Sequence, residues 1–385
     1  VEPPCKYYWK CGGCQLQHMT YDAQLAMKQS QVTNLFHRKA QFSNTIINKT
    51  IGMDHPWHYR NKSQLPIGKD RDGKAIIGYY RQRSHDIIDM DSCLIQDDVH
   101  QDIMNHVKQW IIDYDISVYN ESTKKGLLRH LVIRTGYYSD DKMVVFVTNG
   151  KNFQQASILV EKLKETFPNI TSIKQNINKS HSNVIMGEQS VTLYGKDKIA
   201  DQLSDTTFKI SDQSFYQINS SQTEKLYQQA IEYAQLTGEE TVLDTYCGIG
   251  TIGLYMAPVA KHVYGVEVVP SAIKDAQQNA TLNGFENTTF VCGKAEEVII
   301  KWKQQGIKPD VVMVDPPRKG CDETFLQTLL KLNPKRIVYI SCNPSTQQRD
   351  AQILDSQYEL QEITPVDMFP QTTHVETVAL FERKS

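Results

Sequence analysis

The sequence predicts an α/β fold, with a doubly wound, largely parallel sheet in the C-terminal half and an α+β region before it. Three observations carry this prediction. From about residue 206 onward, strand-like and helix-like segments alternate, which is typical of a parallel sheet covered by helices on both faces. Residues 51–205 are richer in strands and hold only two helical runs. A glycine turn follows the first strand of the second half, at residues 248–253.

The first half of the chain predicts two units. Residues 1–50 carry three cysteines and one helical stretch, at 21–37. Residues 51–205 mix strands with two helices, which suggests an α+β domain. The expected strands there are 75–80, 128–134, 143–148 and 191–194, and the expected helices are 98–113 and 154–166.

The second half, residues 206–385, supplies the alternating pattern. Ligands of such sheets bind beyond the C-terminal ends of the strands, and every motif discussed below in this half lies at such an end. The expected strands are 241–244, 262–267, 288–292, 310–315, 336–342 and 376–383. The expected helices are 220–235, 270–283, 322–332 and 345–356.

Composition narrows the class of protein. With 385 residues, the chain is too long for one ordinary core. No apolar run approaches the roughly 18–20 residues that span a membrane, and the first residues do not form a secretion signal. Eight cysteines without an export signal indicate a reducing, cytoplasmic compartment, with metal binding or catalysis rather than disulfides. Residues 1–85 hold thirteen Lys/Arg against five Asp/Glu, which suggests a polyanionic partner.

The glycine turn indicates a nucleotide site. A strand runs into G-x-G-x-x-G, and Glu267 ends the next strand nineteen residues after Gly248, where a carboxylate can accept ribose hydroxyls. Taken alone, this pattern also fits a dinucleotide. Asp244 directly before the turn and a strand that ends in D-P-P at Asp315 favour S-adenosylmethionine over NAD.

Four ordered motifs make the assignment more specific. They are D-T-Y-C-G-I-G-T-I-G at 244–253, D-P-P-R-K-G at 315–320, S-C-N-P at 341–344 and D-M-F-P-Q-T-T-H-V-E-T-V at 367–378. This set resembles the S-adenosylmethionine-dependent RNA uracil-5-methyltransferase family, most nearly its iron–sulfur-containing members that act on 23S ribosomal RNA. The resemblance covers almost the whole chain. It implies a Rossmann-like class I methyltransferase domain at 206–385, an N-terminal α+β RNA-binding domain at 51–205 and a small iron–sulfur subdomain at 1–50.

Uracil methylation at C5 calls for a cysteine and a carboxylate, because C5 becomes nucleophilic only after a thiolate adds to C6, and a base must then remove the C5 proton. Cys342 ends an expected strand beside Asn343 and Pro344, which suggests an open loop. On its own it would be read as a buried filler. The resemblance implies that Glu376 is the base, although its sequence context alone suggests a surface carboxylate.

The resemblance also implies which residues contact the cofactor. They are Gln217, Tyr246, Thr251, Glu267 and Asp315. Thr251 stands where relatives often have Asn. The remaining cysteines of this half keep a structural interpretation.

Cys5, Cys11, Cys14 and Cys93 form the candidate metal set. Four thiolates suit either zinc or an iron–sulfur cluster. Zinc more typically uses two close pairs, and Cys93 has no C-x-x-C mate, so the spacing modestly favours iron–sulfur. The resemblance implies a [4Fe–4S] cluster with a structural or RNA-positioning role.

A basic and aromatic strip is the candidate RNA contact, since cations neutralise phosphates and aromatic rings stack on bases. It comprises His58, Tyr59, Arg60, Lys62, Lys69, Arg71, Lys74, Tyr79, Tyr80, Arg81 and Arg83, with Arg129 and His130 as a second strip. The resemblance implies RNA as partner, with 23S ribosomal RNA ahead of the T-loop uridine of tRNA, and we expect a monomer with no membrane partner. A TRAM-type β-barrel, common in such enzymes, is not visible.

Two interpretations from other classes stay open at this point. A NAD-linked iron–sulfur oxidoreductase would use the glycine turn and the cysteines, but leaves D-P-P, S-C-N-P and H-x-E without a role. A catalytically idle RNA-binding module is disfavoured by the presence of both Cys342 and Glu376.

Overall fold

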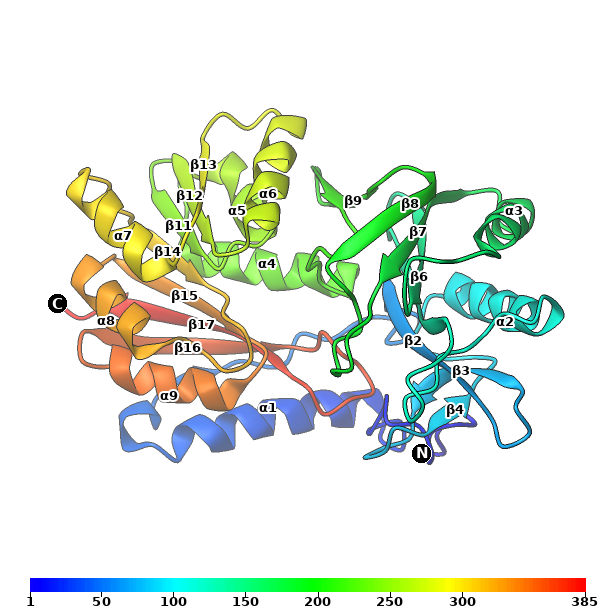
Figure 1. Ribbon diagram of the computed structural model, residues 1–385. Helices are drawn as coiled ribbons and strands as arrows, with labels where there is room; N and C mark the ends of the chain where they lie inside the picture. The colour runs from blue at the N-terminus through cyan, green and yellow to red at the C-terminus, as the bar shows by residue number, and fades with distance from the viewer.

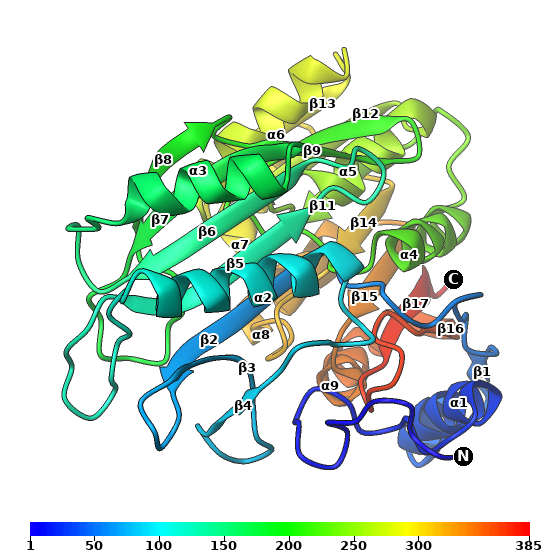
Figure 2. The same cartoon turned by 90° about the vertical axis from the view of Figure 1, so that its right-hand side faces the viewer.

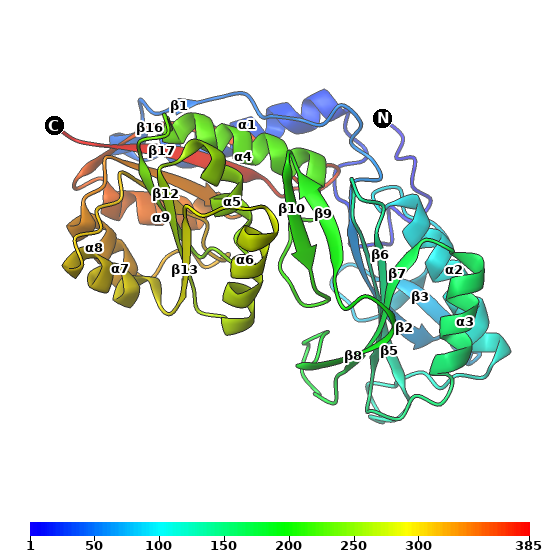
Figure 3. The same ribbon diagram turned by 90° about the horizontal axis from the view of Figure 1, so that it is seen from above.

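The computed structural model describes every residue from Val1 to Ser385. Two β-sheets lie side by side, each with its own helices (Figure 1). Between them lies a two-stranded ribbon formed by β9 (Ile199–Leu203) and β10 (Thr206–Ile210), best seen from above (Figure 3). No helix combines the length and the apolar character needed to cross a bilayer.

The larger sheet has eight strands in the order β1-β16-β17-β15-β14-β11-β12-β13. Strands β11 to β15 run parallel, whereas β17 is antiparallel to both of its neighbours. The central β14 is buried along its whole length, as expected for a parallel strand covered on both faces. The strands are β1 (Ile46–Ile47), β11 (Thr241–Thr245), β12 (His262–Glu267), β13 (Thr288–Cys292), β14 (Val311–Val314), β15 (Arg336–Ser341), β16 (Tyr358–Val366) and β17 (Glu376–Arg383).

Helices cover both faces of this sheet, and each face has its own apolar core. One face carries α4 (Ser220–Ala234), α5 (Thr251–Met256) and α6 (Pro270–Leu282). The other carries α1 (Tyr21–His37), α7 (Ala295–Gln304), α8 (Glu323–Leu332) and α9 (Pro344–Leu354). The short 3-10 turns η1 (Ala40–Phe42) and η2 (Ala257–Val259) pack on opposite faces, η1 beside α1 and η2 beside α5.

The smaller sheet has seven strands in the order β4-β3-β2-β5-β6-β7-β8, antiparallel except for the β6–β7 pair. Two helices, α2 (Asp98–Asp113) and α3 (Ala156–Thr166), pack on one face (Figure 2). Asp97 caps α2, since its carboxylate accepts the Val99 N–H at 3.1 Å. The strands are β2 (Lys62–Lys69), β3 (Ala75–Tyr80), β4 (Ile87–Asp89), β5 (Leu128–Thr135), β6 (Lys142–Thr148), β7 (Ile170–Ile177) and β8 (Gln189–Gly195).

The predicted doubly wound α/β architecture is confirmed. Several strands were not anticipated, and β16 matters most because it precedes the segment that carries Glu376. Strand β16 contains Pro365, although proline lacks the N–H that a strand interior needs. In the structure Pro365 stands next to the end of β16, and its carbonyl accepts the Ile51 N–H at 2.9 Å.

The N-terminal segment has two separate surroundings. The cysteines of residues 5–14 lie against the smaller sheet, whereas Val32 and Phe36 of α1 are fully buried against the larger one. Strand β1 also pairs with β16 of the larger sheet. One part of the expected unit 1–50 therefore packs on the smaller sheet and the other part on the larger sheet. The expected domain boundaries at residues 50 and 205 stay a prediction.

Candidate active site

Cys342 and Glu376 lie at the same edge of the larger sheet because β17 runs antiparallel to β15. Strand β15 ends at Ser341, and antiparallel β17 begins at Glu376. Ser341 pairs with Thr377, so Cys342 and Glu376 follow one residue further along the two neighbouring strands. Asp315 follows β14, which pairs with β15 on the other side. Because β17 is antiparallel, its first residue lies at the same edge of the sheet as the last residues of the parallel strands.

Two carboxyl groups at this edge hold their protons unusually tightly. Glu376 is only 4% exposed, and burial together with the charge of Asp315 raises its pKa to about 8. Burial raises the pKa of Asp315 to about 7. Near neutral pH the pair therefore exchanges protons easily, which is the property required of a general base.

Cys342 is half-buried beside these carboxyl groups. Burial, followed by the charges of Glu376 and Asp315, raises the pKa of its thiol to about 11. The guanidinium of Arg318 acts in the opposite direction on both Cys342 and Glu376. The thiol therefore needs a positive charge or a proton acceptor beside it to react as thiolate.

Arg318 is a residue to which sequence reasoning gave no role, although it lies within the quoted D-P-P-R-K-G motif. Its Nη2 lies 2.9 Å from Nδ1 of His374, two residues before Glu376. Its carbonyl oxygen accepts from Asn343 Nδ2 and Thr346 Oγ1, both at 3.2 Å. One arginine thus ties together the loops that carry Asp315, Cys342 and Glu376.

The glycine turn lies at the same edge of the sheet, after β11. Gly248 and Gly250 both have positive φ angles, 54° and 86°, which a glycine adopts without strain. The Gly248 N–H donates to Glu267 Oε2 at 3.2 Å, and the Val268 and Val269 N–H groups donate to Oε1. The predicted ribose carboxylate is therefore oriented by the backbone around it.

Asp244 lies beneath this turn and has an unmet acceptor. Its Oδ2 accepts the Gly253 N–H at 3.0 Å, while its buried Oδ1 has no partner. A Cβ atom on Gly253 would lie 3.0 Å from that same Oδ2, so any larger residue here would press on the Asp244 carboxylate. Burial and the charges of Asp315 and Glu267 raise the pKa of Asp244 well above its usual range. A partly positive, hydrogen-bond-donating ligand such as S-adenosylmethionine fits this acceptor-rich edge.

The other predicted cofactor residues lie around this turn in different ways. Gln217 is buried, and its carbonyl accepts from Asn61 Nδ2 at 2.8 Å, which fastens its segment to the smaller sheet. The Thr251 hydroxyl lies 3.1 Å from the Tyr227 hydroxyl. Tyr246 has a φ of 58°, and its ring packs edge-on against Phe325 at 5.4 Å.

Tyr227 of α4 is a second residue that sequence reasoning missed. It is almost fully buried, and burial with the charges of Asp315, Asp244 and Glu376 raises its pKa far above the usual value. These charges come from both the glycine turn and the Cys342 edge, so the two halves of the site share one electrostatic environment. Only the apolar face of α4 could have suggested Tyr227, and that face looks like ordinary core.

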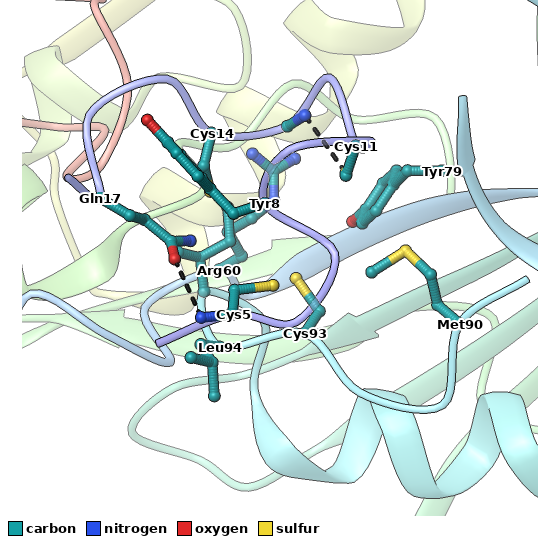
Figure 4. A pocket seen from close by; sticks show the side chains of 12 residues that line it. Cys5, Tyr8, Cys11, Cys14, Gln17, Arg60, Tyr79, Met90, Cys93 and Leu94 are labelled. Carbon is teal, nitrogen blue, oxygen red and sulfur yellow. Dashed lines mark hydrogen bonds between the residues drawn. The ribbon is translucent and has the colours of Figure 1, made fainter. Parts of the chain in front are cut away.

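The four candidate cluster cysteines line one cavity of about 100 Å³ (Figure 4). The sulfur atoms of Cys5 and Cys93 point toward each other there. Gly12 holds the loop against β3, because its N–H donates to the Tyr80 carbonyl at 3.2 Å. No group of three or more His, Cys, Asp or Glu side chains converges closely enough to hold a single metal ion.

Arg60 also lines this cavity, and its buried Nε has no hydrogen-bond partner. An unpaired buried guanidinium donor beside four thiols suits an anionic occupant. Burial raises the pKa of Cys14 to about 12 and that of Cys93 to about 11. The thiols therefore need a strongly cationic centre to become thiolate ligands.

The expected RNA-contacting strip is split by the fold. Lys69, Arg71, Lys74, Arg81 and Arg83 are exposed. His58 is exposed as well, whereas three members face inward: Arg60 and Tyr79 line the cysteine cavity, and the Tyr59 hydroxyl donates to the Pro370 carbonyl. Arg129 is wrong as a contact residue, since it is 7% exposed and donates to the carbonyls of Asn178 and Ser180.

A glycine turn with an oriented carboxylate at the edge of a doubly wound sheet defines a Rossmann-like nucleotide site, and the match to a methyltransferase family makes it a class I, S-adenosylmethionine-dependent methyltransferase. Residues 20–384 match the model of the tRNA (uracil-5-)-methyltransferase family. The chain belongs to this family, and it is an RNA methyltransferase that acts on C5 of uracil.

Relatives and one solved structure agree with this family. A Staphylococcus epidermidis protein described as an uncharacterized RNA methyltransferase is 77% identical over 384 residues, covering 100% of this chain and 84% of the relative. A similarly described Staphylococcus aureus protein is 74% identical, covering 100% and 85%. The Pyrococcus abyssi tRNA (uracil-54, C5)-methyltransferase, solved with S-adenosyl-L-homocysteine, has a TM-score of 0.79 and 31% identity, covering 96% of this chain and 86% of that chain.

Proposed function

We propose that the enzyme methylates uridine through a covalent adduct, with Cys342 as nucleophile and Glu376 as base. The observation that carries the proposal is the position of these two side chains at adjacent strand ends, with Asp315 on the next strand. A buried carboxyl group with a pKa near 8 suits the task of removing a carbon-bound proton.

The proposed reaction has three steps: addition of the thiolate, methyl transfer and elimination. The Cys342 thiolate adds to C6 of uracil, and the C5–C6 electron pair moves toward C5 and O4. C5 then takes the methyl group of S-adenosylmethionine, the S–CH₃ bond breaks with its electron pair staying on sulfur, and S-adenosylhomocysteine leaves. Glu376 then removes the C5 proton, the C5–H electrons re-form the C5–C6 double bond, and the C6–S bond breaks to return the thiolate. Arg318 supports the charged forms of both residues, since its guanidinium lowers their pKa values.

The proposed cofactor contacts are Gln217, Tyr246, Thr251, Glu267 and Asp315. Glu267 is the best supported, because three backbone N–H groups orient its carboxylate beside the glycine turn. Asp315 follows β14 next to that turn, and its carboxyl group shares an electrostatic environment with Asp244.

We further propose that Cys5, Cys11, Cys14 and Cys93 hold a [4Fe–4S] cluster. Four thiols line one cavity with the unpaired Arg60 Nε beside them, and four thiolate ligands in one site suit such an anionic cluster. Such a cluster would fix the fold of residues 5–14, since uracil methylation is redox-neutral. Anaerobically purified protein should be brown and contain iron; colourless protein with one zinc ion would contradict the proposal.

The proposed substrate is 23S ribosomal RNA, acted on by a monomer. The cysteine pattern resembles the ribosomal RNA branch of the family, but it does not by itself decide between the two RNAs, since cluster-bearing members of both types can exist. A specific observation favours tRNA as the second candidate, namely that the solved relative is named for uracil 54 of tRNA. Both substrates present a uridine that must leave its stack to reach Cys342.

The mechanism is tested with RNA that contains 5-fluorouridine. Fluorine at C5 cannot leave as a proton does, so the adduct to Cys342 should persist and survive denaturing electrophoresis. Peptide mapping should place the RNA fragment on Cys342. Wild-type enzyme that methylates uridine but never forms this adduct would contradict the nucleophile.

The substrate is tested separately. Deletion of the gene should remove 5-methyluridine from 23S ribosomal RNA while tRNA keeps its own, as measured by mass spectrometry of the two purified RNA fractions. Loss from tRNA alone would assign the second candidate. Purified enzyme should then methylate unmodified transcripts of the same RNA.

A further inference from the structure

The loop Asp367–Val375 joins β16 to β17 and leads directly into Glu376. Val366 pairs with Glu376, so these two residues form the last strand pair next to the loop. The loop has no regular secondary structure of its own. The position of Glu376 next to this loop therefore depends on what holds the loop.

A buried ion pair holds the beginning of the loop. Lys28 Nζ of α1 donates to Asp367 Oδ1 at 2.6 Å, and both side chains are 0% exposed. Lys28 also reaches the Phe369 carbonyl at 3.3 Å, and the Tyr21 hydroxyl donates to Asp367 Oδ2 at 2.8 Å. Buried charges of this kind fix geometry, because leaving either one unpaired is strongly unfavourable.

A second set of hydrogen bonds holds the middle of the loop at Gln371. Gln24 Nε2 donates to Gln371 Oε1 at 2.9 Å, and the Gln371 N–H donates back to Gln24 Oε1 at 3.1 Å. The N–H groups of Gln15 and Leu16 both donate to the Gln371 carbonyl at 2.9 Å. Gln15 directly follows Cys14, so these two bonds join the end of the cysteine loop to the loop that precedes Glu376.

We propose that residues 15–28 form a clamp that positions Glu376, with Gln24 and Lys28 as its positioning residues. The inference rests on the proposed function of Glu376 as base. Neither Gln24 nor Lys28 has a part in cofactor binding or in the attack of Cys342. The clamp acts on one step, the removal of the C5 proton that follows methyl transfer.

This assignment has a kinetic signature. When the base is displaced, Cys342 still adds to C6 and C5 still becomes methylated, but elimination slows. The methylated RNA then stays attached to Cys342 through the C6–S bond. Clamp variants should therefore accumulate a covalent protein–RNA adduct on ordinary uridine, with lower kcat and an unchanged affinity for S-adenosylmethionine.

The experiment compares Gln24→Ala and Lys28→Met with two references. Glu376→Gln gives the adduct level when the base is absent. Gln29→Ala is the matched control, because Gln29 lies on the same helix and bonds Ile47 rather than the loop, at 3.3 Å. Each protein is mixed with uridine-containing RNA and methyl-labelled S-adenosylmethionine, and the labelled band that co-migrates with protein on a denaturing gel is measured.

We expect kcat to fall by about 10–100-fold in the clamp variants, as for small misplacements of catalytic groups. The steady-state adduct should rise severalfold toward the Glu376→Gln level, and Gln29→Ala should match wild type. Gln24→Ala keeps the Lys28–Asp367 pair, so it tests the clamp even where Lys28→Met does not fold.

The failures are distinguishable. If Glu376→Gln forms no excess adduct, the role of Glu376 itself is contradicted. If Glu376→Gln accumulates adduct while a folded Gln24→Ala is fully active, or loses activity without accumulating adduct, the clamp is overturned and the proposed function stands.

Discussion

The strand-edge site and the cysteine cavity are built by different means. At the strand edge, Asp315 and Cys342 follow two neighbouring strands of one hydrogen-bonded sheet, and Glu376 begins the next strand, after a loop that α1 holds by buried polar contacts. In the cavity, Cys5, Cys11 and Cys14 come from an irregular loop, and Cys93 comes from another loop before α2. A sheet fixes side-chain positions without help from a ligand, whereas loops around a cavity depend more on what fills it. The two sites should therefore respond differently to loss of a single cysteine.

Removal of Cys342 should give the largest effect and leave the fold intact. Because Cys342 is half-buried at a strand end, Cys342→Ala should change the free energy of unfolding by less than about 1 kcal/mol. Methyl transfer should fall by about 10⁴-fold or more, as for other covalent nucleophiles. Single-turnover assays measure methyl transfer, and thermal melting measures stability. Calorimetry should show that the variant still binds S-adenosylmethionine. The exposed Cys292 supplies the control variant Cys292→Ala, and substantial turnover by Cys342→Ala would contradict the mechanism.

Removal of Cys93 should give the opposite pattern. If the cavity holds a cluster, Cys93→Ser loses one ligand and its iron content should fall. The free energy of unfolding should fall with it, by more than about 2 kcal/mol. Turnover of the protein that remains folded should fall far less than in Cys342→Ala. Iron analysis and chemical denaturation measure this, with Cys292→Ser as control. A Cys93→Ser protein with wild-type stability and no iron in either form would remove the distinction between the two sites.

The strand-edge site could be predicted from sequence only in part. The glycine turn, Glu267 and Asp315 follow their strands directly, so their meeting at one edge follows from the parallel pattern. Glu376 could not be placed in this way, because it begins a strand and reaches the edge only through the antiparallel return of β17. Nothing in the local sequence of β17 states its direction, and only the family resemblance pointed to this residue.

The smaller sheet shows a different limit. Arg60 and Tyr79 were read as surface residues because charge and aromatic rings near lysines suggest RNA contact. In the structure they line the cysteine cavity, since β3 and the segment before β2 border it. Sequence composition cannot tell which cations face inward. Lys28, Gln24 and Asp367 escaped notice for the same reason, because buried polar groups become recognisable only with their partners.

Substitution of Arg318 should give the smallest effect and sharpen the electrostatic side of the comparison. Burial and Asp315 raise the pKa of Glu376 to about 8, and Arg318 works against that shift. Glu376 must be deprotonated to remove the C5 proton, so kcat should rise with pH through this range. Arg318→Gln removes the opposing charge, raises the pKa of Glu376 further, and should move the rising limb to higher pH by less than about one unit.

The matched control for Arg318→Gln is Lys319→Gln, which removes an equally charged neighbour whose ammonium lies 3.5 Å from Asp322. Lys319 does not contribute to the pKa of Glu376 or Cys342. A pH profile of kcat measured for both variants should therefore shift only for Arg318→Gln. Equal shifts in both variants would mean that the site senses overall charge rather than this guanidinium. No shift in either variant would mean that the charge of Arg318 does not set the pKa of Glu376. Arg318 would then act on the site only through its bond to His374.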